Sequence, residues 1–317
     1  MVRRRGRYSW LLLAVLLIAI AVYLTATNGW TPLLQKLGFI SPAGAPASGE
    51  LVVDYIDVGN ADAILIRNEG QSMLIDAGET KSDGKKVLDH LAKSGVTKLD
   101  YVIATHFDSD HIGGMTEVIN GIGIDTFILA FMEEKYEPTT KVYLNMLEAL
   151  ANKEVPVCDV TDKQSDIHVG STFTVGSAQC HILGPIEMNK TKNEMSVVCR
   201  VDFGEKRFLF MGDAEEDAEQ ALIDAHADVK ADVIKLGHHG SRSSSHDWFI
   251  EQVGPSYAVI TCGEGNSYDH PHEETLDMLK ARQLPYYRCD LNGTITAVCD
   301  GKTITFTAEK GQVQTPW

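Results

Sequence analysis

The sequence has no excess of positive charge. Lysine and arginine number 28 against 44 aspartate and glutamate residues, which gives a formal net charge of -16. Such a surface repels polyanions at long range, so electrostatics do not favour general nucleic-acid binding unless a local basic groove or a bound metal overrides them. Runs of lysine and arginine interleaved with aromatic residues, which are typical of nucleic-acid-binding surfaces, are also missing.

Cysteine pairs with zinc-ribbon spacing are absent, which argues against a structural zinc finger or ribbon. The six cysteines are Cys158, Cys180, Cys199, Cys262, Cys289 and Cys299. In an exported domain disulfides are permitted, and the sequence leaves disulfides and buried free thiols open as alternatives. No repeat of solenoid period occurs, and 44% hydrophobic with 23% charged residues is typical of a globular domain.

The N-terminus lacks the marks of a cleaved leader. Four arginines precede an apolar run from Trp10 to Leu24, which no small-x-small site and no lipobox cysteine follow. We predict an uncleaved transmembrane signal anchor over residues 1–30, a linker rich in Pro, Ala, Gly and Ser over 31–49, and a globular domain over 50–317. A cleaved signal peptide is the alternative. Both hypotheses place the domain outside the cytoplasm, because the arginines stay inside.

Strand and helix patterns alternate along the globular domain. We expect helices over 82–94, 113–123, 139–153 and 215–227, and strands within 51–78, 99–106, 125–132, 171–185, 195–213, 231–240 and 256–265. The C-terminal segment 286–306 is expected to form a hairpin that turns at Asn292-Gly293. Strand meanders combined with strand–helix units predict an α/β sandwich, in which helices cover sheets.

The segment THFDSDHIGG, residues 105–114, brings two imidazoles and two carboxylates together at the end of an expected strand. These groups are costly to bury without a cation among them. On an extended segment His106 and Asp108 point the same way, and a following turn lets Asp110 and His111 point back. Two such pairs suit two metal ions about 3.5–4 Å apart, whereas the alternative is a solvated acidic turn. The two glycines, 113 and 114, are expected to allow a tight turn and to leave room for substrate.

Other possible ligands also follow apolar strands, where α/β folds place their sites. They are Asp76, Asp213, His238, His239 and His270. Each has a simpler explanation, because aspartates cap helices and form turns and paired histidines often lie on the surface. Together they favour a metal centre.

Seven motifs occur in one order along residues 50–306: LIDAG, THFDSDHIGG, NEMSVV, FLFMGDAE, IKLGHHGSRSSS, NSYDHP and DLNGTI. In this order they resemble the metallo-β-lactamase superfamily, and within it the hydrolase domain of ComEC-like competence proteins. The resemblance implies an αββα fold and a hydrolase with two divalent metal ions, Zn²⁺ or Mn²⁺. Asp108 replaces the second histidine of the usual motif, as in this branch and in choline-phosphate esterases of teichoic acid.

The segment DVGNAD departs from the branch, because Asn60 and Ala61 stand in place of Gln and Gly while Asp62 is kept. This difference puts the substrate loop in question and leaves the metal ligands intact. The channel-forming helices of the competence proteins have no counterpart in the 317 residues. We therefore expect a tethered hydrolase and no DNA channel.

The ligands implied by the resemblance fall into two pairs and a bridge. We expect His106 and Asp108 to hold one ion. Asp110 and His111 then hold the other, and Asp213 bridges the two. The expected metal-binding residues are His106, Asp108, Asp110, His111, Asp213, His238 and His270, with the ions that the last two complete left open.

Two residues are expected to act in catalysis. Asp110 accepts the proton of the attacking water, and His239 is either a further ligand or a contact to the phosphoryl group. Asp76 is expected to orient a histidine, and Ser243 to bind substrate oxygens with neighbouring serines. The expected substrate-binding and supporting residues are Asp62, Asp76, Asn193, Ser196, Ser241 and Ser244.

The carboxylate-rich ligand set favours hard metal ions and anionic substrates, and therefore phosphodiesters over lactams. A phosphodiesterase or nuclease acting on DNA is the first hypothesis. A phosphoesterase acting on cell-wall teichoic-acid substituents is the second, and a surface-tethered binding module without catalysis is the third. The sequence also predicts contact with the membrane through the N-terminal helix, and it indicates no protein partner.

Overall fold

The computed structural model describes residues 49–311 and 313–314. The predicted signal anchor and nearly all of the predicted linker lie outside these residues. Among the helices of the described ranges, none has both the length and the apolar composition to cross a bilayer.

Two sheets form the centre of the described domain. The first has the strand order β15-β14-β1-β2-β3-β4-β5-β6, and the second has the order β13-β12-β11-β10-β9-β8-β7. The strands of the first sheet are β1 (Leu51–Tyr55), β2 (Ile64–Asn68), β3 (Gln71–Ile75), β4 (Lys98–Ile103), β5 (Gly123–Leu129), β6 (Val157–Asp159), β14 (Ile295–Cys299) and β15 (Ile304–Ala308). Those of the second are β7 (Thr172–Val175), β8 (Ala178–Gly184), β9 (Val198–Phe203), β10 (Lys206–Phe210), β11 (Val233–Lys235), β12 (Tyr257–Ile260) and β13 (Tyr286–Arg288).

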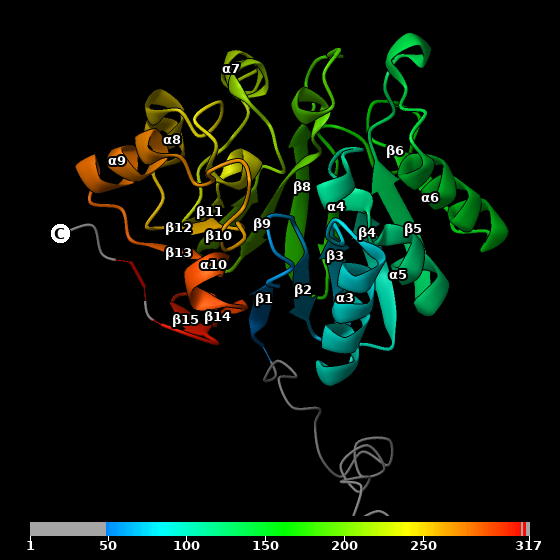
Figure 1. The fold of residues 1–317 in the computed structure, drawn as a ribbon, viewed down its shortest axis with the longest axis horizontal. Helices are drawn as coiled ribbons and strands as arrows, with labels where there is room; N and C mark the ends of the chain where they lie inside the picture. Colours follow the sequence, from blue (N-terminus) through cyan, green and yellow to red (C-terminus); the bar gives the residue numbers. More distant parts are fainter. Residues whose placement is uncertain (1–48, 312, 315–317) are drawn as a thin grey trace, which may run out of the picture. The chain divides into compact units, whose positions relative to one another are not determined.

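Helices cover the outer faces of the two sheets (Figure 1). They are α3 (Lys81–Lys93), α4 (Ser109–Ile112), α5 (Met115–Gly121), α6 (Lys141–Asn152), α7 (Glu216–Asp224), α8 (Asp247–Val253), α9 (Glu273–Ala281) and α10 (Cys289–Asn292), with the short 3-10 turns η1 (Glu134–Tyr136), η2 (Asn193–Met195) and η3 (Gly237–Gly240). In Figure 1, α3, α5 and α6 lie beside the first sheet, and α7, α8 and α9 lie beside the second. This is the αββα sandwich that the sequence predicted.

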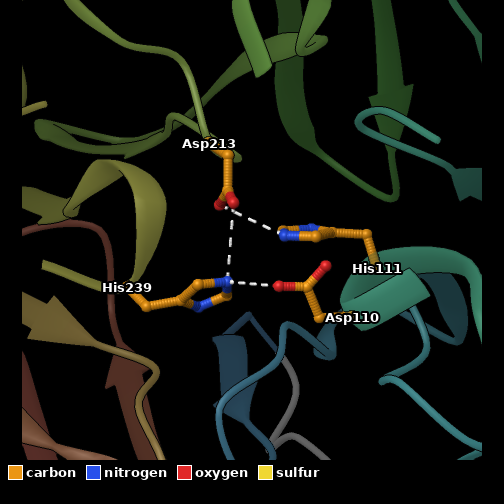
Figure 2. A group of neighbouring side chains, drawn as sticks. All are labelled: Asp110, His111, Asp213 and His239. Carbon is orange, nitrogen blue, oxygen red and sulfur yellow. Dashed lines mark ion pairs between the residues drawn. The ribbon is translucent and has the colours of Figure 1, made fainter. Parts of the chain in front are cut away.

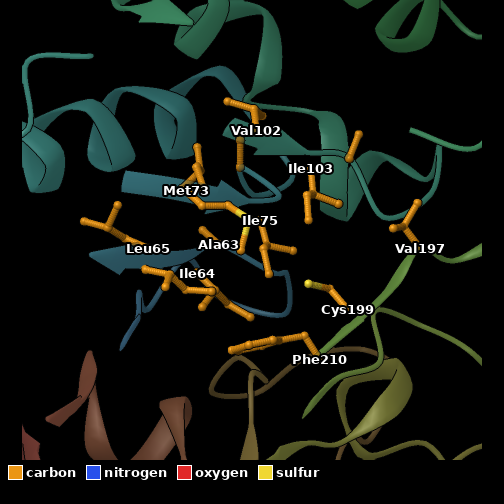
Figure 3. Packing of buried hydrophobic residues seen from close by; sticks show 14 of the residues in the cluster. Ala63, Ile64, Leu65, Met73, Ile75, Val102, Ile103, Val197, Cys199 and Phe210 are labelled. Atoms are coloured by element: carbon orange, nitrogen blue, oxygen red, sulfur yellow. The ribbon is translucent and has the colours of Figure 1, made fainter. Parts of the chain in front are cut away.

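Apolar residues on the facing sides of the sheets explain why the sheets pack together. Ile64 and Ile75 of the first sheet belong to one buried cluster with Cys199 and Phe210 of the second (Figure 3). A second cluster joins the outer face of the second sheet to α7, α8 and α9. The last residues of β3, β4 and β10 are apolar and consecutively buried, as is typical of strand ends that are covered on both faces.

Parallel strands bring the ends of distant segments to one edge of each sheet. β3, β4, β5 and β6 pair in parallel, as do β10, β11, β12 and β13. The loops that follow β3, β4, β10, β11 and β12 contain the histidines and aspartates that the sequence analysis selected. The carboxyl ends of parallel strands share one edge of a sheet, so each sheet can present its own loops to a common site.

Two local predictions need correction. The predicted hairpin turn at Asn292-Gly293 is wrong, because Asn292 ends α10 and its side chain accepts a hydrogen bond from the Arg288 amide. The strands on either side, β13 and β14, belong to different sheets, and the hairpin joins β14 to β15. The sequence analysis also missed α8 and α9. All six cysteines are buried and free.

Candidate metal centre

Four side chains from three loops converge at the edge where the sheets meet (Figure 2). Asp110 and His111 lie in α4 after β4, Asp213 follows β10, and His239 lies in η3 after β11. Their ligand atoms all lie within 4.8 Å of one another. His111 Nε2 lies 3.2 Å from Asp213 Oδ1, and His239 Nε2 lies 3.5 Å from Asp213 Oδ2 and 3.3 Å from Asp110 Oδ2. Asp213 is therefore placed centrally, as the bridging role requires.

A second group of side chains also approaches Asp213. His106 Nε2 lies 3.5 Å from Asp108 Oδ2 and 3.9 Å from Asp213 Oδ2. The outer oxygen of Asp108 accepts a hydrogen bond from the Lys192 ammonium. His238 also approaches the carboxylate of Asp213, and its Nε2 lies 3.8 Å from Asp213 Oδ2. The two predicted pairs, His106 with Asp108 and Asp110 with His111, thus each bring a histidine to one shared aspartate.

Buried residues contact the Nδ1 atoms of His111 and His239. Asp76 Oδ2 lies 2.7 Å from His111 Nδ1, which is the orienting contact expected of Asp76. The same carboxylate accepts hydrogen bonds from the amide and hydroxyl of Thr105, at 2.8 and 2.7 Å. His239 Nδ1 lies 2.7 Å from the carbonyl oxygen of Thr261. Each contact directs Nε2 of its histidine toward the centre of the site.

Ser196 contacts two of the proposed ligand residues, Asp213 and His106. Its hydroxyl accepts a hydrogen bond from the Asp213 amide at 3.1 Å and lies 3.4 Å from His106 Nδ1. Ser196 is fully buried, so it contacts the supposed ligands and is shielded from substrate. Ser241 and Ser244, also expected to bind substrate, do not line the cavity in front of the ligands. Ser244 donates instead to the carbonyl oxygen of Gly237, and the predicted role of both serines in substrate binding stays a prediction.

Lys235 is a buried residue of this site that the sequence analysis missed. Its ammonium is fully buried at the end of β11, 2.6 Å from Asp62 Oδ2, 3.1 Å from the Gly212 carbonyl oxygen and 4.0 Å from Asp213 Oδ1. Asp62 also accepts a hydrogen bond from the Thr261 hydroxyl. The available signal was a lone lysine inside the apolar run VIKL, where a charge is expensive unless it is paired.

The backbone is strained at three of these positions. Asp76, His238 and His239 have φ angles of 58°, 46° and 53°, in the left-handed region that residues with a β-carbon rarely adopt. Such strain is concentrated at functional sites, where the surrounding structure holds it in place.

The glycine pair after His111 has a packing role that the sequence analysis did not foresee. A β-carbon on Gly113 would meet the Glu79 carbonyl oxygen at 1.6 Å, and one on Gly114 would meet the Ala77 carbonyl oxygen at 2.1 Å. Both residues have ordinary right-handed angles, and neither lines the cavity. Gly113 and Gly114 form the turn between α4 and α5, as predicted, and the predicted room for substrate stays a prediction. The glycines let the backbone that carries Asp110 and His111 pack directly against the loop after β3.

A cavity of about 260 Å³ opens in front of the ligands. Asp108, Asp110, Asp213, His238, His239 and His270 line it, together with Asn60, Ser109, Asn193 and Tyr268. His238 is held by Glu215, whose Oε1 lies 2.8 Å from His238 Nδ1, so the other nitrogen faces Asp213. The ring of His270 lies 5.3 Å from that of His238, on the cavity wall.

Opposite charges shift the acid–base equilibria of the buried groups. Burial disfavours the charged form of His239, but Asp213, Asp110 and Asp62 outweigh it and raise its pKa to about 9. Burial likewise opposes ionisation of Asp213, yet His111 and His239 hold its pKa well below the ordinary value. The pKa of His270 is lowered to about 4 by burial and by the neighbouring histidines. Without a cation, the centre thus holds protons between its carboxylates.

The donor set fits divalent metal ions. The Nε2 atoms of His106, His111 and His239 and Oδ1 of Asp213 are buried and make no hydrogen bond within the described part of the chain. Buried polar atoms normally have hydrogen-bond partners, so a cluster of buried atoms without them favours a bound ligand at this place. Imidazole nitrogens and carboxylate oxygens are common ligands of zinc and manganese.

Comparisons with known proteins agree with this geometry. The model of the metallo-beta-lactamase superfamily matches residues 56–264. The chain is 30% identical over 292 residues to ComE operon protein 3 of Bacillus subtilis, which covers 86% of this chain and 36% of that protein. It is also 30% identical to competence protein ComA of Neisseria gonorrhoeae, over 89% of this chain and 38% of that protein. The chain thus spans little more than a third of the length of these relatives.

Among solved structures, Igni18, a metallo hydrolase from Ignicoccus hospitalis, superposes with a TM-score of 0.50. The identity is 15%, and the match covers 78% of this chain and 98% of that chain. At this identity the likeness supports the fold alone.

Proposed function

Because the chain belongs to the metallo-β-lactamase superfamily, we propose that it is a metal-dependent phosphodiesterase that acts on DNA strands. The observation that carries the proposal is the convergence around Asp213 of buried histidine nitrogens and carboxylate oxygens that make no hydrogen bond among the described residues. The resemblance to two competence proteins over most of this chain supports DNA as the substrate.

Two groups of side chains would hold the metal ions. Asp110, His111 and His239 would bind one ion, and His106 with Asp108 would bind the other, with Asp213 shared. The distances favour His239 over His270 for the first ion, since His239 Nε2 lies within 3.5 Å of two carboxylates. His238 is a quarter exposed in the cavity wall and is better suited to contact a substrate phosphoryl group.

A bound pair of divalent ions would supply Lewis-acid stabilisation and activation of water. The side chains around the ions would position the substrate and transfer protons. Asp110 carries its carboxylate at the cavity edge, where it can accept the proton of the attacking water. The Glu215 carboxylate lies against His238 Nδ1 and fixes the ring so that Nε2 faces the cavity, where the doubly protonated ring would donate a hydrogen bond to a phosphate oxygen. Asn193 adds an amide donor on the same wall.

The balance of charge favours an anionic substrate and a hard metal ion. Asp62, Asp76, Asp108, Asp110 and Asp213 bring five carboxylates to the site, and Lys235 brings one ammonium. Two divalent cations cancel the net negative charge of this set. A phosphodiester anion would therefore enter a site without net charge and would not be repelled by excess negative charge. Replacement of a histidine ligand by Asp108 shifts the preference from zinc toward manganese.

The direct test is hydrolysis by the full-length chain loaded with Mn²⁺ or Zn²⁺. Methyl p-nitrophenyl phosphate, single-stranded DNA and a choline-phosphate ester are offered separately. We expect cleavage of the first two, and loss of both activities in Asp213→Asn, which removes the shared ligand. Glu251→Gln, a change on the exposed face of α8, serves as the control. Cleavage of the choline ester alone would replace DNA by a cell-wall phosphodiester, and metal binding without any hydrolysis would contradict the proposal.

The proposal includes a membrane tether, on the basis of the apolar run from Trp10 to Leu24. An extracytoplasmic, anchored enzyme would meet DNA before or during its passage into the cell. Fractionation of cells that express the full chain tests the tether, with a variant lacking residues 1–30 as the comparison. Recovery of both forms in the soluble fraction would count against it.

A further inference from the structure

A second cavity adjoins the one in front of the metal ligands. It has a volume of about 300 Å³, and four of its lining residues also line the first cavity: Asn60, Ser109, Asp110 and Tyr268. The two cavities therefore lie next to each other and share a partition formed by these four residues. We call the second one the side cavity. A substrate phosphate at the metal ligands would have its attached group directed into this space.

The side cavity is unsuited to a second phosphate. Glu79 and Glu264 lie exposed on its wall, and Asp110 is shared with the first cavity. Its ten lining residues, all within the described part of the chain, include no lysine or arginine. Like charges repel at this range, so the next phosphate of a polynucleotide would meet two carboxylates and no cation.

An aromatic surface stands at the junction of the two cavities. The ring of Tyr268 is 64% exposed and lies stacked against His270, with the ring centroids 5.7 Å apart and the planes inclined by 24°. Asn266 holds the backbone beneath it, because its side chain accepts from the Tyr268 and His270 amides and donates to two carbonyl oxygens. A fixed, exposed ring of this kind is a platform on which a base stacks.

Several polar groups of the side cavity are hydrogen-bond acceptors. Asn60 Oδ1 is buried and has no hydrogen-bond partner among the described residues, and the carboxylates of Glu79 and Glu264 accept as well. An acceptor-rich cavity with a stacking face favours a group that presents hydrogen-bond donors and a planar ring and carries no negative charge. A nucleoside with a free terminal hydroxyl has these properties, and a nucleotide with a terminal phosphate does not.

We propose that the side cavity binds the terminal nucleoside of a strand ending in a free hydroxyl, so that the enzyme hydrolyses nucleic acid from an end. The inference rests on the proposed function. Water is the only co-reactant: its oxygen forms a bond to phosphorus, the bond from phosphorus to the departing oxygen breaks, and the proton of the water passes to that oxygen. The inference also accounts for a DNA-cleaving enzyme with a net charge of -16, since an enzyme that binds an end needs no basic track along the strand.

The test compares three dinucleotides on the metal-loaded, full-length chain: thymidylyl-thymidine with both ends free, with a 5′-phosphate, and with a 3′-phosphate. Only one of the two terminal phosphates, 5′ or 3′, would lie in the side cavity. That phosphate should slow hydrolysis about tenfold or more, and the phosphate at the other end should leave the rate unchanged. In the double variant Glu79→Gln/Glu264→Gln, the ratio of the slow rate to the rate on the unphosphorylated dinucleotide should rise toward one. Glu251→Gln, which removes a remote exposed carboxylate, should leave that ratio at its wild-type value.

Two further measurements address stacking and direction. Tyr268→Ala should raise the KM for thymidylyl-thymidine by about ten- to a hundredfold relative to the KM for methyl p-nitrophenyl phosphate, and Tyr268→Phe should restore it. Linear single-stranded DNA should be degraded and circular single-stranded DNA spared. Equal cleavage of circular and linear DNA, or equal rates on all three dinucleotides, would overturn the inference alone. Failure to hydrolyse methyl p-nitrophenyl phosphate as well would overturn the proposed function with it.

Discussion

Lys235 Nζ lies 2.6 Å from Asp62 Oδ2, and the two side chains are 0% and 1% exposed. The pair joins the two sheets, because Lys235 ends β11 of the second sheet and Asp62 precedes β2 of the first. It also lies directly behind the candidate ligands, with Asp62 Oδ1 3.4 Å from His239 Nδ1. Burial opposes the charged form of Lys235, but Asp62 and Asp213 outweigh it and raise its pKa.

Removing Lys235 should therefore destabilise the domain strongly. In Lys235→Met the buried carboxylate of Asp62 loses its nearest counter-charge, and breaking such a buried pair typically costs about 3–5 kcal/mol. Urea unfolding monitored by circular dichroism measures the change. Lys206→Met is the matched control: its ammonium pairs with Asp232 at a partly exposed position, and its loss should cost roughly 1 kcal/mol or less. Equal costs for the two variants would contradict a structural role for the buried pair.

Asp76→Asn should weaken metal binding while the fold is retained. The substitution keeps a side chain that can accept from Thr105, but it removes the charge that orients and polarises His111. Loss of such a contact typically lowers metal affinity about 10- to 100-fold. Titration calorimetry with Mn²⁺ or Zn²⁺ measures the affinity. Asp100→Asn, which alters a carboxylate bound to the Ser72 amide in the same sheet, should leave the affinity unchanged.

Metal affinity should rise with pH up to about pH 9, because the ligand histidines with raised pKa must lose their protons to bind metal. The pKa of His239 is raised to about 9, so below that pH the metal must displace a proton, and binding weakens as the pH falls. Calorimetric titrations between pH 6 and 9 measure the slope. His239→Ala should remove one proton from that dependence, whereas the same change at the partly exposed His272 should not. A flat profile in the wild type would show that no such proton is displaced.

The buried pair of Asp54 and Arg67 should make the domain sensitive to acid. Burial opposes ionisation of Asp54, but His90 and Arg67 outweigh it and hold the pKa of its carboxyl below the ordinary value for aspartate. A lowered folded-state pKa contributes stability that is fully present above the unfolded value and is lost as the pH falls through the folded value. Urea unfolding between pH 6 and 2.5 should show the loss, and Asp54→Asn should flatten the acid limb. An unchanged acid limb in that variant would exclude Asp54 as its source.

Local patterns in the sequence determined much of this protein. Period-2 and continuous apolar runs predicted the strands, and the motif after β4 identified His106, Asp108, Asp110 and His111 as possible ligands. These predictions succeed because burial selects apolar residues at fixed spacing and because ionisable residues rarely follow buried strands in clusters without a cation. The turn at Asn292-Gly293 failed for a physical reason as well. An Asn-Gly pair suits a hairpin, but here Asn292 closes a short helix whose flanking strands pair in different sheets.

Only the tertiary structure decided which side chains meet. Spacing cannot reveal that His239, rather than His270, lies beside Asp110, since the two histidines are brought there by separate loops. The contact of Lys235 with Asp62 crosses between sheets over 173 residues of chain, and no local pattern encodes it. The side cavity likewise combines segments near residues 60, 79, 110 and 264. Sequence patterns act over a few residues, whereas sites form where strand ends from distant segments share one edge of a sheet.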